Sequence, residues 1–324
     1  MKFLLFAFNL AVCISTAFAA PEVTDVVAKQ RYPWNGLVDI TCKVSGIDDL
    51  VTDCKFYVSA LIPDSGSVAK MSDFWVVRDS KKSTDLSVIT NGNYRLLWDA
   101  KADLGQVCYT NMVVRVMVKG HQKVQLWEGG PYWADTNIGA EEPHEYGYYF
   151  WWGDTVGYKR KGSVWVASDG SNSSFSFGSS NTPTYNKSTS TLQSEGWITS
   201  EGVLAPEHDA AQAHWGGSWR MPTKAELENL HSKCTWTWTA TNGVNGYIVR
   251  GKGEFASASI FLPAAGYGHE TSLKHAGSDD CYWSSVPDSD DYNNAWSFCF
   301  YSSCYFSHYR YIGQSVRAVQ GFTE

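Results

Sequence analysis

The stretch Ser284–Val319 reads SSVPDSDDYNNAWSFCFYSSCYFSHYRYIGQSVRAV and changes character towards its end. Residues 286–312 contain no Lys, Glu, Gln or Met, and their single tryptophan is Trp296. The stretch then ends in the ordinary apolar sequence GQSVRAV, residues 313–319. This ending predicts a buried last strand that closes the fold, in which Arg317 pairs with a framework acid.

Large apolar side chains recur at every second position of residues 296–301. Because successive side chains of a strand point to opposite faces, Trp296, Phe298 and Phe300 are predicted to face the core and hold the scaffold. The residues between and after them are predicted to face outward: Ser297, Cys299 and Tyr301.

Much of the stretch is too polar or too aromatic to be core throughout. Tyrosine gives a binding surface rigid contact area with a polar tip, and Ser and Asn adapt their hydrogen bonds. We therefore predict a ligand-binding face. Its residues are Asp290, Asp291, Tyr292, Asn294, Ser297, Cys299, Tyr301, Cys304, Phe306, His308, Tyr309 and Tyr311.

Residues 1–19 have the pattern of a secretory signal peptide. Lys2 precedes an apolar run, and Ala17 and Ala19 place small residues before a cleavage point near Ala19/Ala20. No later run approaches the ~20 apolar residues that a membrane helix needs, so no transmembrane segment is predicted. We expect the mature protein to be secreted or held at the cell surface.

Composition and charge narrow the classes of function. The net charge is −7 and no basic stripe occurs, so nucleic acid is not an expected partner. The chain has 15 Trp, 18 Tyr and 15 Phe, more than the core is expected to hold, so part of them should lie on the surface. Abundant Gly, Ser, Asn and Thr favour β structure with long loops.

Cleavage of the signal peptide removes Cys13 and leaves seven of the eight cysteines, an odd number. Cys299 and Cys304 are five positions apart and can form a disulfide. No CxxC or Cys/His zinc spacing is present, so no metal site and no cofactor are predicted. A further disulfide can form in the N-terminal half, whose cysteines are Cys42, Cys54 and Cys108.

Turn signals and alternating patterns divide the mature chain into two units. Residues 20–118 contain short strands at regular spacing, such as LVDITCKVSG at 37–46, and predict an immunoglobulin-like or fibronectin-like β-sandwich. Residues 119–130 are predicted to be a linker, and residues 131–324 a second domain. Within that domain, Thr223 and Glu226 form a Thr-x-x-Glu capping box that predicts the start of a helix.

The second domain resembles the "major paralogous domain" group of secreted bacterial proteins over residues 127–324. The motifs that carry the resemblance are WADTNIGA at 133–140, EYGYYFWWGD at 145–154, WRMPT at 219–223, FLPAAG at 261–266, YWSS at 282–285 and GQSVRAV at 313–319. That group looks like a branch of the C-type lectin-like fold related to formylglycine-generating enzymes. The implied fold class is mixed and β-rich, an immunoglobulin-like β-sandwich followed by an α+β C-type lectin-like domain.

Together, the resemblance and the strand patterns give a set of scaffold positions for this domain. They are Trp219, Arg220, Trp283, Trp296, Phe298, Phe300, Gly313 and Arg317.

Some members of this fold are the variable proteins of diversity-generating retroelements. There, a reverse transcriptase copies a template repeat with errors at adenines, so template AAY codons become NNY codons, which never encode Lys, Glu, Gln, Met or Trp. Residues 286–312 use this alphabet, with Trp296 as the exception. The resemblance thus implies an exported, non-enzymatic binding protein with a variable region at 284–319 and a protein or cell-surface ligand.

Two other functions remain open. One is an invariant carbohydrate-binding surface lectin, although the usual calcium-dependent sugar motifs are absent. The acidic run DSDDYNN at 288–294 suits Ca²⁺ in residue type but matches no calcium loop in spacing, so a solvated turn is expected. The other is a formylglycine-generating-like enzyme, for which we find no matching catalytic motif. Its candidate cysteines are Cys234 and Cys281, with Cys299 and Cys304 in the variable region.

His208, Asp209 and His214 suggest a metal or acid–base site. The two histidines are six positions apart, however, and a helix would place them on different faces. Structural roles are therefore expected for all three.

Overall fold

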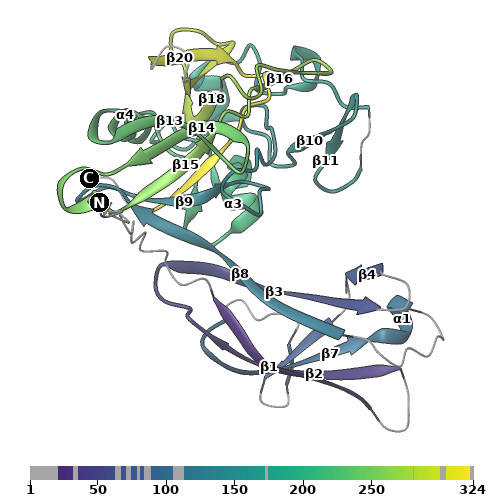
Figure 1. The fold of residues 1–324 in the computed structure, drawn as a ribbon. Helices are drawn as coiled ribbons and strands as arrows, with labels where there is room; N and C mark the ends of the chain where they lie inside the picture. Colours follow the sequence, from purple (N-terminus) through teal and green to yellow (C-terminus); the bar gives the residue numbers. More distant parts are fainter. Residues whose placement is uncertain are drawn as a thin grey trace, which may run out of the picture.

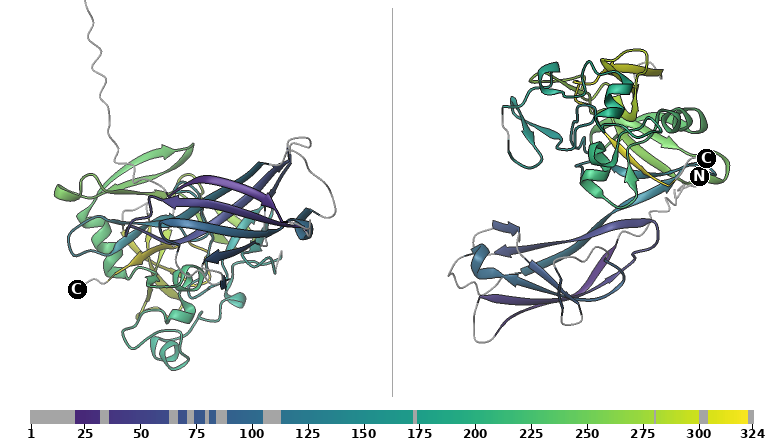
Figure 2. Two further views of the ribbon diagram at one scale, coloured as in Figure 1. Left: turned by 90° about the horizontal axis from the view of Figure 1, so that it is seen from below. Right: turned by 180° about the vertical axis from the view of Figure 1, so that it is seen from behind.

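The computed structural model describes residues 21–31, 36–62, 67–70, 74–78, 81–83, 89–104, 113–171, 174–279, 281–299 and 304–321. The predicted signal peptide, Cys108, Phe300 and Tyr301 lie outside these ranges. The described chain is rich in β structure, with several sheets and a few short helices. It forms two units at opposite ends of the molecule (Figure 1), and Figure 2 shows the same two units from behind and from below.

The N-terminal unit is built from two sheets packed face to face. One is antiparallel, with strands β1 (Glu22–Gln30), β2 (Leu37–Ser45), β7 (Gly92–Asp99), β5 (Phe74–Arg78) and β6 (Lys81–Ser83) in that spatial order. The other contributes β8 (Val113–Gln125), β3 (Val51–Ile62) and β4 (Ser67–Lys70), and helix α1 (Ala100–Leu104) follows β7. The predicted alternation in β2 is confirmed, because Val38, Ile40, Cys42 and Val44 are all buried in the core between the sheets.

One continuous sheet joins the two units. Its six strands have the order β12-β21-β9-β8-β3-β4, in which β9 (Tyr132–Asn137), β21 (Arg317–Gln320) and β12 (Trp219–Arg220) belong to the second unit. The predicted linker 119–130 is therefore a strand as far as Gln125. It is a strand because β8 pairs with β3 as far as Gln122 and then with β9 from Lys123 onward.

The second unit surrounds this sheet with smaller elements. Its other strands are β10 (Tyr158–Lys161), β11 (Val164–Ala167), β13 (Thr235–Thr241), β14 (Val244–Arg250), β15 (Ser259–Pro263), β16 (Tyr267–His269), β17 (Ser272–Lys274), β18 (Cys281–Pro287), β19 (Asn294–Cys299) and β20 (Cys304–Tyr309). The helices are α2 (Thr189–Ser194), α3 (Ala210–Trp215) and α4 (Lys224–Lys233), with 3₁₀ turns η1 (Ser179–Asn181), η2 (Pro206–His208) and η3 (Gly253–Phe255).

Helix α4 begins where the sequence predicts. The Thr223 side chain accepts a hydrogen bond from the Glu226 backbone N–H, and the Glu226 carboxylate accepts one from the Thr223 N–H, which completes the capping box. Glu226 is fully buried and also binds Arg220 with both oxygens, at 2.7 and 2.5 Å. In the described part of the chain, no helix is long and apolar enough to cross a membrane.

The end of the chain is buried as predicted. Residues 313–319 are inaccessible to solvent or nearly so, although the strand itself is shorter and covers Arg317–Gln320. Gly313 is required by a close approach, because a Cβ there would lie 2.4 Å from the Phe177 ring. Of the other predicted scaffold residues, Trp219 and Trp283 are 0% exposed and pack in the central core.

Asp154 is a buried carboxylic acid of the second unit, with 3% of its surface exposed. It makes the stability of the folded state depend on pH. Its oxygens accept hydrogen bonds from the N–H groups of Val156 and Gly157, which lower its pKa, but burial outweighs them and raises the pKa to about 7. An acid with a raised pKa keeps its proton in the folded state at a pH where the unfolded chain has lost it. The free energy of unfolding must therefore fall as pH rises between those two pKa values.

We predict a decline of up to about 1.4 kcal/mol per pH unit between roughly pH 4 and pH 7 from this one group. Asp154→Asn should remove that decline, whereas Asp49→Asn, at an exposed turn, should keep it. Urea denaturation at a series of pH values, followed by tryptophan fluorescence, measures both. Identical pH profiles for the wild type and Asp154→Asn would contradict the assignment.

Candidate functional site

The candidate site is built on the antiparallel sheet β18-β19-β20, with β19 in the middle. Figure 1 shows β20 at the end of the second unit that lies farthest from the N-terminal unit. The turn between β18 and β19 spans residues 288–293, and the segment after β20 leads into the buried residues 313–319. Most of the predicted ligand face belongs to these two connections and to β20.

The turn after β18 is ordered by its own carboxylates. Asp288 accepts a hydrogen bond from the Asp290 N–H, and Asp291 accepts from the Asn293 N–H and from the Asn294 side-chain amide. Within this turn the side chains of Asp290 and Tyr292 are exposed, Tyr292 to 51%. The turn therefore displays one carboxylate and one aromatic ring on a fixed backbone.

A tyrosine cluster forms the second part of the face. The rings of Tyr309 and Tyr311 stack with their centroids 5.1 Å apart, and the Tyr185 ring meets them edge-on at 6.4 and 5.3 Å. Tyr309 is 46% exposed, and Tyr185 and Tyr311 are half-buried. Burial and the neighbouring Tyr185, Tyr309 and Glu270 raise the pKa of Tyr311. We call Tyr185, Tyr309 and Tyr311 the tyrosine cluster below.

One member of this cluster and one neighbour of it were not predicted from the sequence. Tyr185 comes from the long polar loop before α2, and His269 of β16 lies with its ring centroid 6.1 Å from that of Tyr311. The one local signal for Tyr185 is a large aromatic residue in an otherwise polar loop, in the sequence TPTYNK. Nothing near His269 indicates that it borders the end of β20.

Two positions predicted to face outward are buried. Ser297 is 1% exposed and its hydroxyl lies 2.8 Å from Nδ1 of His308, and Cys299 is 3% exposed. The reason is that β19 is flanked by strands on both edges and covered on both faces. On its other face Phe298 is buried as predicted, while Trp296 is only half-buried and packs under the Lys224 ammonium, 3.4 Å from the ring centroid.

The other predicted face residues divide in three ways. Asn294 and His308 are half-buried. Cys304 and Phe306 belong to β20, but their side chains lie outside the described part of the structure. Tyr301 is outside it altogether.

Arg310 is a structural residue that no local sequence pattern predicts. Its side chain is 0% exposed and donates hydrogen bonds to the carbonyl oxygens of Asn294, Thr184 and Lys187 at 2.8–2.9 Å. The guanidinium also lies 5.1 Å from the Trp152 ring centroid. Burial lowers its pKa to about 10. Arg310 thus fastens the segment between Tyr309 and Tyr311 to the loop that carries Tyr185.

Cys299 forms a disulfide with Cys281. The predicted Cys299–Cys304 bridge is therefore corrected. Cys299 has a cysteine directly opposite it on each neighbouring strand, Cys281 on β18 and Cys304 on β20, and the bond is made to β18. Together with His308, the two bonded sulfurs form a cluster of potential metal ligands within 4.8 Å of one another, but the disulfide occupies both sulfurs. Of the two other cysteines proposed for an enzyme site, Cys234 is a buried thiol whose pKa burial raises to about 11, and the side chain of Cys304 lies outside the described part of the structure.

Asp209 and its neighbours have the structural roles expected from the sequence. Asp209 is the N-cap of α3, accepting from the N–H groups of Ala211 and Gln212, and its second oxygen accepts from the Met221 N–H. His208 stacks on Trp197 with centroids 3.9 Å apart. The ring of His214 contacts the carbonyl of Val156 through Nε2 at 3.2 Å.

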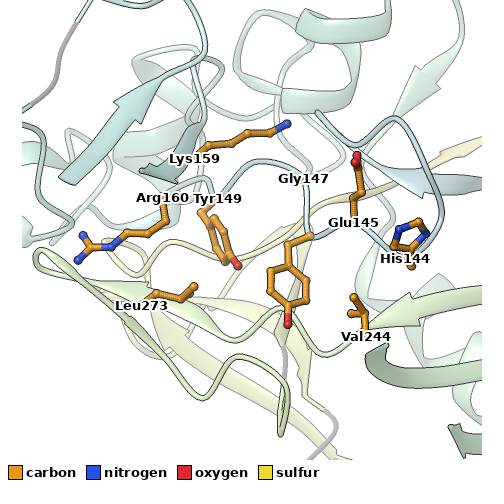
Figure 3. Close-up of a pocket in the computed structure, with 9 residues that line it drawn as sticks. His144, Glu145, Gly147, Tyr149, Lys159, Arg160, Val244 and Leu273 are labelled. Carbon is orange, nitrogen blue, oxygen red and sulfur yellow. The ribbon is translucent and has the colours of Figure 1, made fainter. Parts of the chain in front are cut away.

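A pocket of about 380 Å³ lies elsewhere in the second unit, around β10 (Figure 3). Its wall includes Lys159, Arg160 and Glu145, and Figure 3 shows the two basic side chains pointing away from each other. Arg160 donates to the carbonyl of Thr271, and the Lys159 ammonium lies 4.8 Å from the Tyr148 ring centroid. Both cations are thus engaged by the protein itself, which makes this pocket a weaker candidate than the tyrosine cluster.

Comparison with known proteins gives one match. A family model described as a domain of unknown function (DUF8237) matches residues 223–322, which extend from the capping box of α4 past the last strand and include the whole of β18, β19 and β20. No curated protein and no solved structure matches the chain.

The disulfide gives a direct test of this site. We predict that a peptide map under non-reducing conditions contains a Cys281–Cys299 cross-link. Cys281→Ser should lower the free energy of unfolding by about 3 kcal/mol, because a bridge across 18 residues restricts the unfolded chain. Urea denaturation measures this loss, and wild-type protein in the presence of dithiothreitol is its control. A map dominated by Cys299–Cys304 would contradict the pairing.

Proposed function

We propose that this is an exported, non-enzymatic ligand-binding protein. In this proposal an immunoglobulin-like β-sandwich supports a C-type lectin-like domain that displays a variable binding face at its far end. The observation that supports it best is the tyrosine cluster. Its Tyr309 ring is exposed and lies at the end of β20, opposite Asn294 and so beside the turn that displays Tyr292. This end of the molecule is the farthest from the sandwich, and both tyrosines belong to the segment of restricted alphabet.

The geometry of the face suits binding in a specific way. Tyr309 and Tyr311 hold each other by stacking, and Arg310 between them is fastened by three hydrogen bonds to backbone carbonyl oxygens. Little side-chain freedom is left to lose when a ligand arrives, which lowers the entropic cost of association. The exposed carboxylates of Asp290 and Glu270 add acceptors at the edge, so a partner with basic or hydrogen-bond-donating groups is favoured.

Three of the four candidate cysteines support a binding role over an enzymatic one. Cysteine-based catalysis needs a thiolate, which an accessible, electropositive site provides. Cys281 and Cys299 are joined in a disulfide, and the Cys234 thiol is buried with a raised pKa. None of the three offers a nucleophile in this state.

We further propose that the face is diversified by a retroelement. The support is the residue alphabet of 286–312 combined with the exposure of Asp290, Tyr292 and Tyr309. Residues that lie on the surface can be exchanged at little cost in stability, which a diversified segment requires.

Removing the exposed rings should weaken binding without unfolding the protein. We predict that Tyr292→Ala combined with Tyr309→Ala lowers binding by at least about tenfold, since two aromatic contacts are lost. The melting temperature should change little. The readout is labelled protein on a panel of cultured cells, with and without trypsin treatment, and on a glycan array.

Trp238→Ala is the matched control, because Trp238 is similarly exposed, at 43%, but lies on β13. It should leave binding unchanged. Binding confined to the glycan array would favour the invariant-lectin alternative. Equal binding by the double variant and the wild type would refute this face.

The retroelement proposal has its own test in the genome of origin. A reverse-transcriptase gene should lie near this gene, with a template repeat that matches codons 284–319. The template should carry adenines at the codons for Asp290, Tyr292, Tyr309 and Tyr311. Because Arg310 is buried and donates hydrogen bonds to three backbone carbonyl oxygens, its codon should instead be identical in template and gene. Absence of any template repeat would leave a protein of fixed sequence.

A further inference from the structure

A second pocket lies at the junction of the two units, apart from the tyrosine cluster. It has a volume of about 310 Å³ and is enclosed by β3 and β8 of the N-terminal unit, by β9 with the loop after it, and by the end of α3. Figure 1 shows these elements meeting in the middle of the molecule. Ligand sites occur preferentially at such domain junctions.

Two lysines lie side by side at this pocket. Lys55 of β3 is directly opposite Lys119 of β8, and both side chains line the pocket. Like charges in directly opposite positions of a sheet repel each other. The Lys119 ammonium lies 3.5 Å from a carboxylate oxygen of Glu141 and 3.5 Å from one of Glu142, and both glutamates are largely exposed. For Lys55, the described part of the chain provides no carboxylate within 4.0 Å, so an anion between the two ammonium groups would relieve the repulsion.

The wall of the pocket also contains hydrogen-bond acceptors and a hydroxyl group. Asp135 and Glu141 line it, and carboxylates accept hydrogen bonds from hydroxyl groups. Thr136 also lines it and is 5% exposed, and its hydroxyl has no hydrogen-bond partner among the described residues. Rotation of that hydroxyl towards the pocket would therefore break no existing hydrogen bond. A buried hydroxyl without a partner is costly, and a polar ligand would remove that cost.

Aromatic rings complete the wall. Tyr57, Tyr148 and Trp215 all line the pocket, and Tyr57 is 41% exposed at its edge. The ring of His121 stacks on that of Trp215, with the centroids 3.6 Å apart. Burial, together with the charge of Lys55, lowers the pKa of His121 to about 4. At neutral pH this imidazole is thus uncharged and can both donate and accept. The two lysines suit an acid group of a ligand, the carboxylates suit its hydroxyl groups, and the exposed Tyr57 ring suits an apolar face.

We propose that the junction pocket binds a monosaccharide-sized acidic sugar, with its carboxylate between Lys55 and Lys119 and its hydroxyls towards Asp135 and Thr136. This site is separate from the face proposed above and does not depend on it. A sugar bound here contacts both units at once and so stabilises their junction.

The test is isothermal titration calorimetry on the full mature chain at pH 7 and low salt. The probes are D-glucuronate and N-acetylneuraminate, with D-glucose as the neutral control and acetate as the simple anion. We expect at least one acidic sugar to bind about tenfold or more tighter than both controls. Lys55→Gln should weaken that binding by at least about tenfold, because a charge-assisted hydrogen bond is lost.

Two variants show whether the effect is local. Lys43→Gln removes an exposed lysine from β2 and should leave affinity unchanged, and so should Tyr309→Ala in the tyrosine cluster. Lys55 is itself exposed, so its loss should not unfold the protein, which a thermal melt verifies. Binding of neither acidic sugar, acetate binding as tight as the sugar, or full affinity in Lys55→Gln would each overturn the proposal.

Discussion

The buried guanidinium of Arg317 is the interaction on which the arrangement of the second unit depends. Its side chain is 1% exposed and donates to the carbonyl oxygens of Ala134, Asp135 and Phe261 and to the amide oxygen of Asn137, at 2.8–3.0 Å. The last strand is thereby tied to β9 and to β15. Each acceptor left unpaired in this interior would cost roughly 1–3 kcal/mol. The charge of Arg317 also opposes the rise that burial causes in the pKa of Asp135.

This anchor also links the site to the rest of the molecule. The strand that holds Arg317 lies in the sheet that runs without interruption through β9 and β8 into the N-terminal unit. Residues 312–316 connect this strand to Tyr311, which is only six positions before Arg317. The sheet that holds Arg317 is thus a rigid support for the segment that carries Tyr309 and Tyr311. Binding residues are commonly positioned by a rigid scaffold in this way.

Local sequence patterns predicted local structure well. The capping box at Thr223 and Glu226 and the alternation in β2 depend on residues within a few positions of one another, and both are present. Features that depend on distant partners were missed. The segment 119–125 is a strand only because β3 and β9 pair with it, and Tyr185 reaches the site from a loop 124 positions before Tyr309.

The error at Ser297 and Cys299 has the same origin. A period of two shows which residues share a face, but it does not show whether that face meets solvent. Here His308 covers Ser297, and a disulfide to β18 holds Cys299, so the second face of β19 is also closed. The exposed positions lie instead in the turn before β19, at Asp290 and Tyr292, and at Tyr309, the last residue of β20.

Side chains at the end of β20 alternate between the tyrosine cluster and the interior. This alternation explains how residues of the predicted ligand face could be exchanged while the fold is kept. Tyr309 and Tyr311 point their rings into the tyrosine cluster, whereas Arg310 and Ile312 between and after them are buried. Replacing Tyr309 removes a largely exposed contact, but replacing Arg310 would leave three carbonyl oxygens without their donor. Packing therefore restricts which positions of a variable segment can vary, and a restricted alphabet alone cannot separate Arg310 from its neighbours. The separation follows from burial, because a side chain that is fully enclosed cannot belong to the displayed surface.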